Sequence, residues 1–497
     1  MSNGISRRWF IRNEFFPIII FLIFCSAIII FFSLEMVLLL ACVIFSIVLT
    51  NFDLKLILIL LIFVIPITRF PVISQYVELA KLIFSFGILV IWFIRSNTRI
   101  IVELRYNPVS IFFVLFIMVM LIDIPFAQDR ATALLATFSH TVLFALFYLL
   151  CDFFKDRDFL IRTIRVFFLT GIIVAFIAII QYITVQYEMF LRIGQIFLPE
   201  THRYGMLFRS SDLYKIIGYR SVGTFYHPNL LGLYLSMVLP LIVVFVLTVK
   251  NVKLKIILWT SMLTIVCGMV CSGSRGAFLS SCVSILFIII FLWDRISKWE
   301  ISIFAVMPIL IGLRFYEKII YYLRLEGVLS YRDLIWNNTI RLIGLHPFFG
   351  IGLGGFHKTY LLRYGFPSIV DFQNTINAIA LTGSSEWMLG FHAHNLFLNY
   401  AAELGLFIIP VLIFYYFIFF KEFLISFKAR RHIDPNDFVV IVGCIAVIAG
   451  NLVYGFFEAA TNFYNFSIGL AFILISSIGI SLMLSNKAKI AERYAGR

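Results

Sequence analysis

Charged side chains are scarce in this sequence of 497 residues: Asp, Glu, Lys and Arg together make up 13%, against about a quarter in an ordinary soluble domain. Hydrophobic residues make up 62% and aromatic residues 17%. This composition excludes a soluble globular class and indicates an integral membrane protein. Because many apolar runs are about 15–25 residues long, they predict membrane-spanning helices and not the shorter, alternating strands of a barrel.

Cysteine is also poorly placed for covalent or metal chemistry. Five of the seven cysteines fall inside apolar runs, and the long polar loops have none, so we expect neither a disulfide framework nor a thiolate metal site. The run Phe15–Phe32 is too long for a signal-peptide core and lacks a small-residue cleavage site, so we do not expect a cleaved signal. The formal net charge of +14 is typical of basic cytoplasmic loops in a membrane protein and does not indicate a nucleic-acid partner.

The apolar runs predict an all-α, polytopic membrane helix bundle of about 14 spans (12–14), with a large loop that contains short helices. No internal repeat or low-complexity linker interrupts it, so residues 1–497 are expected to form a single integral membrane domain. The predicted spans are 15–32, 34–50, 54–67, 77–94, 109–125, 131–150, 164–183, 228–249, 256–272, 277–293, 301–313, 395–420, 438–457 and 466–484.

Lysine and arginine predict the orientation of these spans, because basic residues crowd cytoplasmic loops. Basic clusters follow alternate spans and recur near both ends of the chain, which predicts a multi-pass protein with both termini in the cytoplasm. Two long exterior segments, 184–227 and 314–394, nevertheless carry several arginines. Solvation alone explains any one of these arginines about as well as function does.

Arg275 is different, because it lies in the very short turn Ser272-Gly273-Ser274-Arg275-Gly276 between two spans. A positive charge near hydrocarbon costs up to roughly 3 kcal/mol on insertion scales. We therefore expect an anionic partner for Arg275.

The exterior segment 314–394 has a predictable local structure. Ser330 and Asp333 have the spacing of a capping box, so a helix is expected from Tyr331 to about Gly344. Arg332 and Trp336 then share one helix face. Pro347 and the glycines that follow it predict a compact turn with backbone N–H groups near a ligand; these glycines are Gly350, Gly352, Gly354 and Gly355.

Several exterior arginines and a histidine, without an evident metal site, suit transfer from a lipid diphosphate. The planar guanidinium group binds phosphate oxygens in a bidentate fashion, and a diphosphate leaves as a stabilised anion. The acceptor hydroxyl needs a base with a pKa near neutrality, which is the role that histidine fills best. His394 is the candidate base, because Asn395 and, on the same run, Glu403 follow it at the start of an apolar run.

The metal-dependent alternative has weaker support. Asp156-Arg157-Asp158 is predicted on the cytoplasmic side, where a solvated loop is the simpler interpretation. His392 and His394 form a histidine pair without an evident third ligand. His140, inside a span, is expected to be a hydrogen-bonded bundle residue, and His227, before Pro228-Asn229, is expected to be a helix cap or a residue of the acceptor site.

Four sequence segments between residues 220 and 410 together resemble the O-antigen ligase and O-antigen polymerase superfamily, membrane transferases that move a glycan from undecaprenyl diphosphate in the periplasmic leaflet. These segments are Arg220–Phe225 with His227-Pro228-Asn229, Ser272–Gly276, Arg332–Trp336 with Pro347 and Gly350–Gly354, and His394-Asn395 with Glu403-Leu404-Gly405. By this resemblance residues 228–410, with the exterior loop 314–394, are the ligase-like core.

The resemblance implies an inverting, metal-independent transferase without a cofactor. It implies that His394 activates the acceptor hydroxyl and that Arg220 and Arg275 hold the diphosphate; Arg332 is a further candidate for the diphosphate, with His227, Asn229, His392, Asn395 and Glu403 as supporting residues. The donor would be an undecaprenyl-diphosphate-linked glycan, and the acceptor either lipid A core or another lipid-linked glycan. The implied location is the bacterial inner membrane, with a periplasmic active site.

Two questions stay open at this level. The ligase pattern of a histidine followed by Gly-x-x-Gly is only partly met, because Gly405 is in register but Ile408 stands at its partner position. Ligase and polymerase therefore remain alternatives. A lipid-linked oligosaccharide flippase or transporter is a rival from another class, although transporters favour charged or interrupted helices at mid-membrane and the ionisable residues here gather at one predicted rim.

Overall fold

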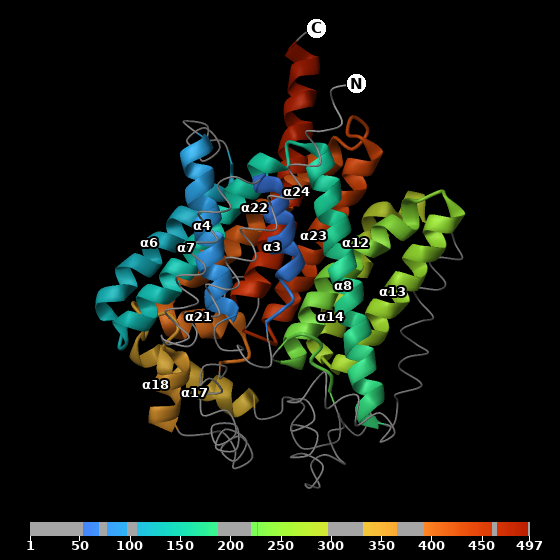
Figure 1. Ribbon diagram of the computed structural model, residues 1–497. Coiled ribbons are helices and arrows are strands. Elements are labelled where there is room, and N and C mark those ends of the chain that lie inside the picture. The colour runs from blue at the N-terminus through green and yellow to red at the C-terminus, as the bar shows by residue number, and fades with distance from the viewer. Residues whose placement is uncertain are drawn as a thin grey trace, which may run out of the picture.

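The protein is described here from a computed structural model, in which residues 53–68, 77–96, 107–186, 220–225, 227–296, 332–364, 392–459 and 465–495 are placed. Within these ranges the regular structure is entirely helical (Figure 1). The predicted all-α membrane bundle is confirmed.

Ten helices in the described ranges are long and apolar enough to cross a membrane. They are α4 (Val77–Ser96), α6 (Val109–Asp123, continued by the 3-10 turn η3, Ile124–Phe126), α7 (Arg130–Phe153), α8 (Arg157–Gln186), α12 (Pro228–Thr248), α13 (Val252–Ser272), α14 (Arg275–Leu292, continued by η5, Trp293–Arg295), α22 (Ile408–Lys428), α23 (Pro435–Gly455) and α24 (Phe466–Ala495). A shorter apolar helix, α3 (Leu54–Val64), matches the predicted span 54–67. The predicted spans 15–32, 34–50 and 301–313 lie outside the described residues.

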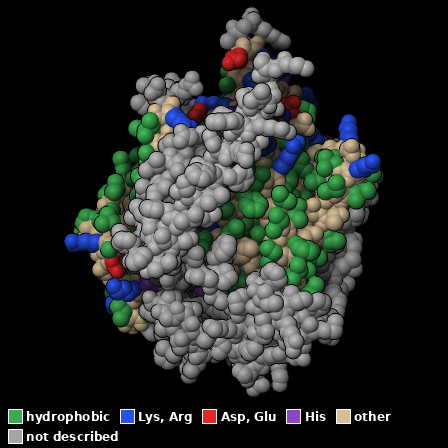
Figure 2. All heavy atoms as spheres, viewed as in Figure 1, with side chains coloured by type: hydrophobic (Ala, Val, Ile, Leu, Met, Phe, Trp, Pro, Cys, Tyr) green, Lys and Arg blue, Asp and Glu red, His purple; other side chains and the backbone are tan. Residues whose placement is uncertain are grey.

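The membrane-crossing helices differ in how much of their surface is exposed. Helices α12, α23 and α24 are almost fully buried and form the centre, with α14 and α13 packed beside α12. The outer helices expose leucine, isoleucine and valine side chains, for example on α6 and α13. Figure 2 shows hydrophobic side chains over the middle of the molecule, with Lys and Arg side chains toward its upper end and others at the left edge of its lower half. This distribution is the one expected for helices in a bilayer.

We refer to the two ends of the bundle by their helices. The C-terminal part of α24 projects from the upper end in Figure 1, the α24 end, and the short helices α17 (Arg332–Leu345), α18 (Phe356–Tyr364) and α21 (Leu396–Leu404) lie at the opposite, α21 end. Helix α17 agrees to within one residue with the helix predicted over 331–344.

The prediction of one span over 395–420 is wrong. Helix α21 ends at Leu404, Gly405 has φ +78°, and α22 begins only at Ile408. A Cβ at Gly405 would collide with the backbone of Phe348 and Phe349, so the chain breaks where another segment comes close. Hydropathy does not reveal this break, because both sides of it are apolar.

The glycine-dense turn of 350–355 fastens α17 and α18 to the bundle. The N–H groups of Ile351 and Gly352 donate to the carbonyls of Ala402 and Glu403 at the end of α21. A Cβ at Gly350 would collide with the Glu403 carbonyl, so this close approach requires glycine. In the described contacts these backbone groups bind the protein itself, although the sequence suggested that they would face a ligand.

The α24 end is joined by ion pairs between the helix-connecting turns. Lys55 Nζ lies 2.6 Å from a carboxylate oxygen of Asp156, and Arg157 lies 2.8 Å from Asp437. Asp156, the first residue of the Asp-x-Asp sequence, therefore lies in an ion pair at the end opposite α21.

Candidate functional site

Arg220 lies over the tight turn between α13 and α14. Its Nε donates to the Ser272 carbonyl at 2.8 Å. Gly273 ends α13 with φ +58°, and a Cβ there would stand 3.2 Å from Arg220 Nε. Glycine therefore lets the turn form and leaves room for the guanidinium group. Ser274 caps α14 through the N–H of Ala277, which places Arg275, an exposed side chain, at the first position of that helix.

The start of α12 connects this arginine to a carboxylate. His227 caps the helix, since its Nδ1 accepts the N–H of Asn229, and Pro228 occupies the first helical position, where its missing N–H is harmless. Asn229 then makes two side-chain bonds: its Oδ1 accepts from Arg220 at 2.6 Å, and its Nδ2 donates to Glu458 Oε2 at 2.8 Å. One carboxamide thus joins the guanidinium group to Glu458.

The segment from His392 to Asn395 is held on three sides. The Ala393 carbonyl accepts from Trp336 Nε1 at 2.9 Å, and the Ala393 N–H donates to Asn399 Oδ1. Asn395 caps α21 and donates from Nδ2 to the Phe456 carbonyl, just before Glu458. These bonds bring α17, α21 and the end of α23 together around the two histidines.

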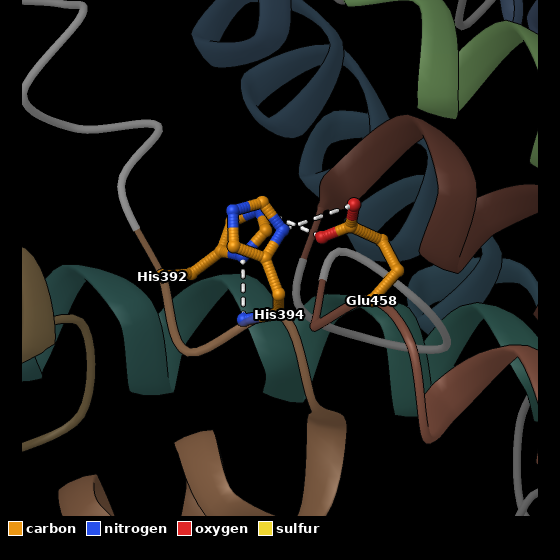
Figure 3. A group of neighbouring side chains, drawn as sticks. All are labelled: His392, His394 and Glu458. Carbon is orange, nitrogen blue, oxygen red and sulfur yellow. Dashed lines mark hydrogen bonds and ion pairs between the residues drawn. The ribbon is translucent and has the colours of Figure 1, made fainter. Parts of the chain in front are cut away.

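Glu458 is the common partner of the groups at this end, as Figure 3 shows for its histidine contacts. Its Oε1 lies 2.9 Å from His392 Nε2 and accepts the N–H of Ala459. Its Oε2 lies 3.5 Å from His394 Nδ1 and accepts from Asn229. The Glu458 side chain is only 3% exposed. Contacts with four neighbouring groups compensate for the loss of water around its carboxylate.

His394 combines backbone strain with partial access to solvent. It has φ +49°, and among the non-glycine residues that the structure describes no other has a positive φ. Such a conformation costs of order 1–3 kcal/mol and persists where surrounding contacts enforce it, often at functional sites. The His394 side chain is 26% exposed, against 12% for His392, so it is the more accessible of the two imidazoles.

The protonation states follow from burial and charge. Burial tends to raise the pKa of the Glu458 carboxyl, but the facing His392 and His394 hold that pKa well below its usual range. Burial lowers the pKa of His394 below its ordinary value and outweighs the opposing effect of Glu458. Burial also lowers the pKa of His227 to about 3. At neutral pH the site therefore holds an ionised carboxylate beside neutral imidazoles at His227 and His394.

His392, His394 and Glu458 also form a group whose ligand atoms lie within 4.8 Å of one another, a set that suits a divalent metal. The carboxylate is the third ligand that the sequence did not reveal. The hydrogen bond made by His392 argues against metal binding by this group. His392 Nδ1 accepts the backbone N–H of His394, so a proton of this ring belongs on Nε2, which faces Glu458. A metal bound at that Nε2 would need the proton on Nδ1, against the His394 N–H.

Most of the residues singled out from the sequence lie at the α21 end. Arg220, His227, Asn229, His392, His394 and Asn395 belong to the connected network described above. Arg332 begins α17, one helical turn before Trp336, and its charge is close enough to contribute to the lowered pKa of His394, after burial and His392.

Two predicted residues serve the scaffold in the described contacts. Glu403 accepts the N–H of Phe356 and so binds the start of α18. His140 is fully enclosed: its Nδ1 lies 2.8 Å from the Ala136 carbonyl, and its Nε2 lies 2.9 Å from the Tyr400 hydroxyl. This is the hydrogen-bonded bundle histidine that was expected.

Glu458 is the site residue that sequence reasoning missed. The available signal was an acidic residue directly after an apolar span, on the same predicted side as the histidine pair. Its partner Asn229 is 229 positions away in the chain, so no local spacing indicates the contact.

Comparison with known proteins gives one family. Residues 260–416 match the family described as O-antigen ligase, a segment that includes the α13–α14 turn, α17, α18, α21 and the histidine pair. The match confirms the resemblance found in the sequence segments. No curated protein matches the chain.

Proposed function

Because residues 260–416 match the family described as O-antigen ligase, we propose that the chain belongs to the O-antigen ligase and polymerase superfamily and transfers a glycan from undecaprenyl diphosphate to a sugar hydroxyl. The acceptor is lipid A core in a ligase or a second lipid-linked glycan in a polymerase. One observation carries the proposal: Glu458 and Asn229 connect Arg220 with His392 and His394 in a single network of hydrogen bonds and ion contacts around a buried carboxylate. A cation for the donor and a base for the acceptor then belong to one site.

The donor diphosphate binds Arg220 of this network together with Arg275 and Arg332. Arg220 is held at Nε by a carbonyl and at one terminal nitrogen by Asn229, which fixes the plane of its fork. Arg275 and Arg332 each begin a helix, and helix N-termini favour anions. Three guanidinium groups balance the charge that develops on the departing diphosphate.

His394 acts as the general base. With a proton on Nδ1, toward Glu458, its Nε2 carries the lone pair. The acceptor oxygen attacks the anomeric carbon of the donor sugar while its proton moves to Nε2. The bond from that carbon to the phosphate oxygen breaks, and the electron pair leaves with the lipid diphosphate. Attack opposite the leaving group inverts the anomeric configuration, and Glu458 stabilises the imidazolium that forms.

The reaction is placed on the periplasmic face of a bacterial inner membrane. The argument is the distribution of basic residues: the turns at the α24 end carry lysines and arginines on several connections, including Lys155, Lys250 and Arg430. Basic residues of this kind stay in the cytoplasm, so we assign the α21 end to the outside and the C-terminal part of α24 to the inside.

Reconstitution tests the proposal. The purified chain in liposomes, given a lipid-diphosphate-linked glycan and a candidate acceptor, should form a covalent glycan product, and EDTA should leave the rate unchanged. Arg220→Lys should reduce the rate, because an ammonium group does not reproduce the bidentate fork. Movement of the donor across the bilayer without a covalent product would identify a transporter instead, and a rate abolished by EDTA would refute the metal-independent mechanism.

A further inference from the structure

Five exposed apolar side chains lie together at the α21 end, away from the histidine site. They come from three chain segments: η3, the turn after α17, and the break between α21 and α22. The ring of Phe126 stacks on that of Phe349, with centroids 4.1 Å apart, and the rings of Phe348 and Phe407 lie 6.2 Å apart. With Leu406, these residues are between 41% and 61% exposed. We call this group the apolar collar.

Two backbone N–H groups beneath the collar are hydrogen-bonded within the chain. The N–H of Leu406 donates to the Pro347 carbonyl at 2.8 Å, and the N–H of Gly350 donates to the His346 carbonyl at 3.1 Å. A backbone that satisfies its own polar groups can present its side chains to an apolar environment, whereas free N–H and C=O groups prevent this.

The collar continues the outward surface of two membrane-crossing helices. Helix α6 exposes Met118, Leu121 and Ile122 immediately before η3. Helix α22 exposes Ile413 and Phe417 immediately after the Leu406–Phe407 break. Aromatic side chains are typical of this depth, at the boundary of hydrocarbon and headgroups.

Charged groups mark the polar edge next to the collar. Lys358 of α18 pairs with Asp129 at 3.4 Å, and Arg130 donates to the Pro125 carbonyl at 3.1 Å. Asp129 and Arg130 follow Phe126 within four residues. The order along the surface is therefore apolar helix, aromatic collar and ion pairs, which matches the order of hydrocarbon, interface and water.

We propose that the apolar collar inserts into the leaflet at the α21 end and that lipid acyl chains are its partner. The collar includes the turn that ends α17, the helix that carries Arg332 and Trp336. Insertion thus anchors in the membrane the same unit that holds the His392–Asn395 segment through Ala393. This inference does not depend on the proposed reaction, because it concerns only what contacts the collar.

Photocrosslinking in a bilayer tests this inference. Phe348 and Phe407 are each replaced by p-benzoylphenylalanine, a close relative of phenylalanine, and the full chain is placed in nanodiscs of phosphatidylethanolamine and phosphatidylglycerol. Illumination should give adducts with the mass of one phospholipid at both positions. Leu121 on α6 is the matched position within the hydrocarbon and should give the same adduct, and Asn337, an exposed polar position on α17, should give none.

Two results would overturn the proposal. One is an absence of lipid adducts at 348 and 407 in samples where position 121 reacts. The other is a protein adduct of twice the chain mass at 348 or 407, which would make the collar an interface between two copies. Neither result bears on glycan transfer.

Discussion

Charged side chains meet at both ends of this bundle, but in opposite settings. At the α24 end, Lys55 and Asp156 form an ion pair in which each side chain is about one-third exposed. At the α21 end, Glu458 is 3% exposed and contacts two histidines, an asparagine and a backbone N–H. The first arrangement joins two turns at the surface, and the second removes a carboxylate from water.

The difference separates charges that serve the scaffold from charges placed for chemistry. An exposed ion pair is worth about 0–1 kcal/mol, so a protein gains or loses little by it. A buried carboxylate is costly unless several groups share its charge. The strained backbone at His394 adds to this cost. A chain that maintains both features at one end is expected to use them, and the predictions below test this contrast from the largest effect to the smallest.

Removing the imidazole of His394 should have the largest effect. If His394 is the base, His394→Ala should lower the transfer rate by about 10²- to 10⁴-fold, measured with saturating donor and acceptor. His432→Ala, a change at the α24 end, is the matched control and should leave the rate unchanged. Equal rates for the two variants would show that His394 is not the base. They would also contradict the functional difference between the α21 end and the α24 end.

Removing the charge of Glu458 should come next. A hydrogen bond to a charged group is worth about 1.5–3 kcal/mol, so Glu458→Gln should slow transfer by roughly 10- to 100-fold. The loss should appear in kcat, because Glu458 acts through His394. Glu422→Gln is the control: Glu422 is also buried but pairs with Lys487 at the α24 end. A loss confined to the KM of the donor would mean that Glu458 serves only Asn229 and Arg220.

His394 and Glu458 also show which parts of the candidate site could be predicted from the sequence and which could not. His394 was identified because its neighbours Asn395 and Glu403 lie on the same run of sequence. The helices were predicted for the same reason, since an apolar run of sufficient length is a local property. Glu458 was missed because its partners come from α12 and from the segment before α21, and a single carboxylate after a span resembles an ordinary solvated charge.

The break at Gly405 was missed for a related physical reason. The apolar pattern continues through it, and what interrupts the helix is the backbone of Phe348 and Phe349 from a distant segment. Glu403 was grouped with the histidines by its position in the sequence, and in the structure its carboxylate accepts the N–H of Phe356 at the start of α18. Position in the sequence does not reveal this contact, because the two residues are 47 positions apart.

The pH dependence of transfer should show a moderate effect. The base must be neutral, and the pKa of His394 is lowered below its ordinary value of 6.5. The rate should therefore begin to fall only at a more acidic pH than an ordinary imidazole with a pKa of 6.5 would give, as the ring of His394 gains a proton. The negative charge of Glu458 raises the pKa of His394, so Glu458→Gln should move this acid limb to lower pH. A limb that moves to higher pH in the variant would contradict the assignment.

The smallest effect is expected at the α24 end, where Lys55→Ala removes an ion pair and leaves Asp156 in contact with water. Because the pair is partly exposed, its loss should produce only a small decrease in the melting temperature of the purified protein, with a transfer rate within about twofold of the unmodified chain. Asp156 retains the N–H groups of Asp158 and Phe159 as donors, so the turn that starts α8 should persist. A large loss of activity in this variant would mean that the two ends of the bundle are energetically coupled. Ion pairs at the α24 end would then contribute to glycan transfer and not only to stability.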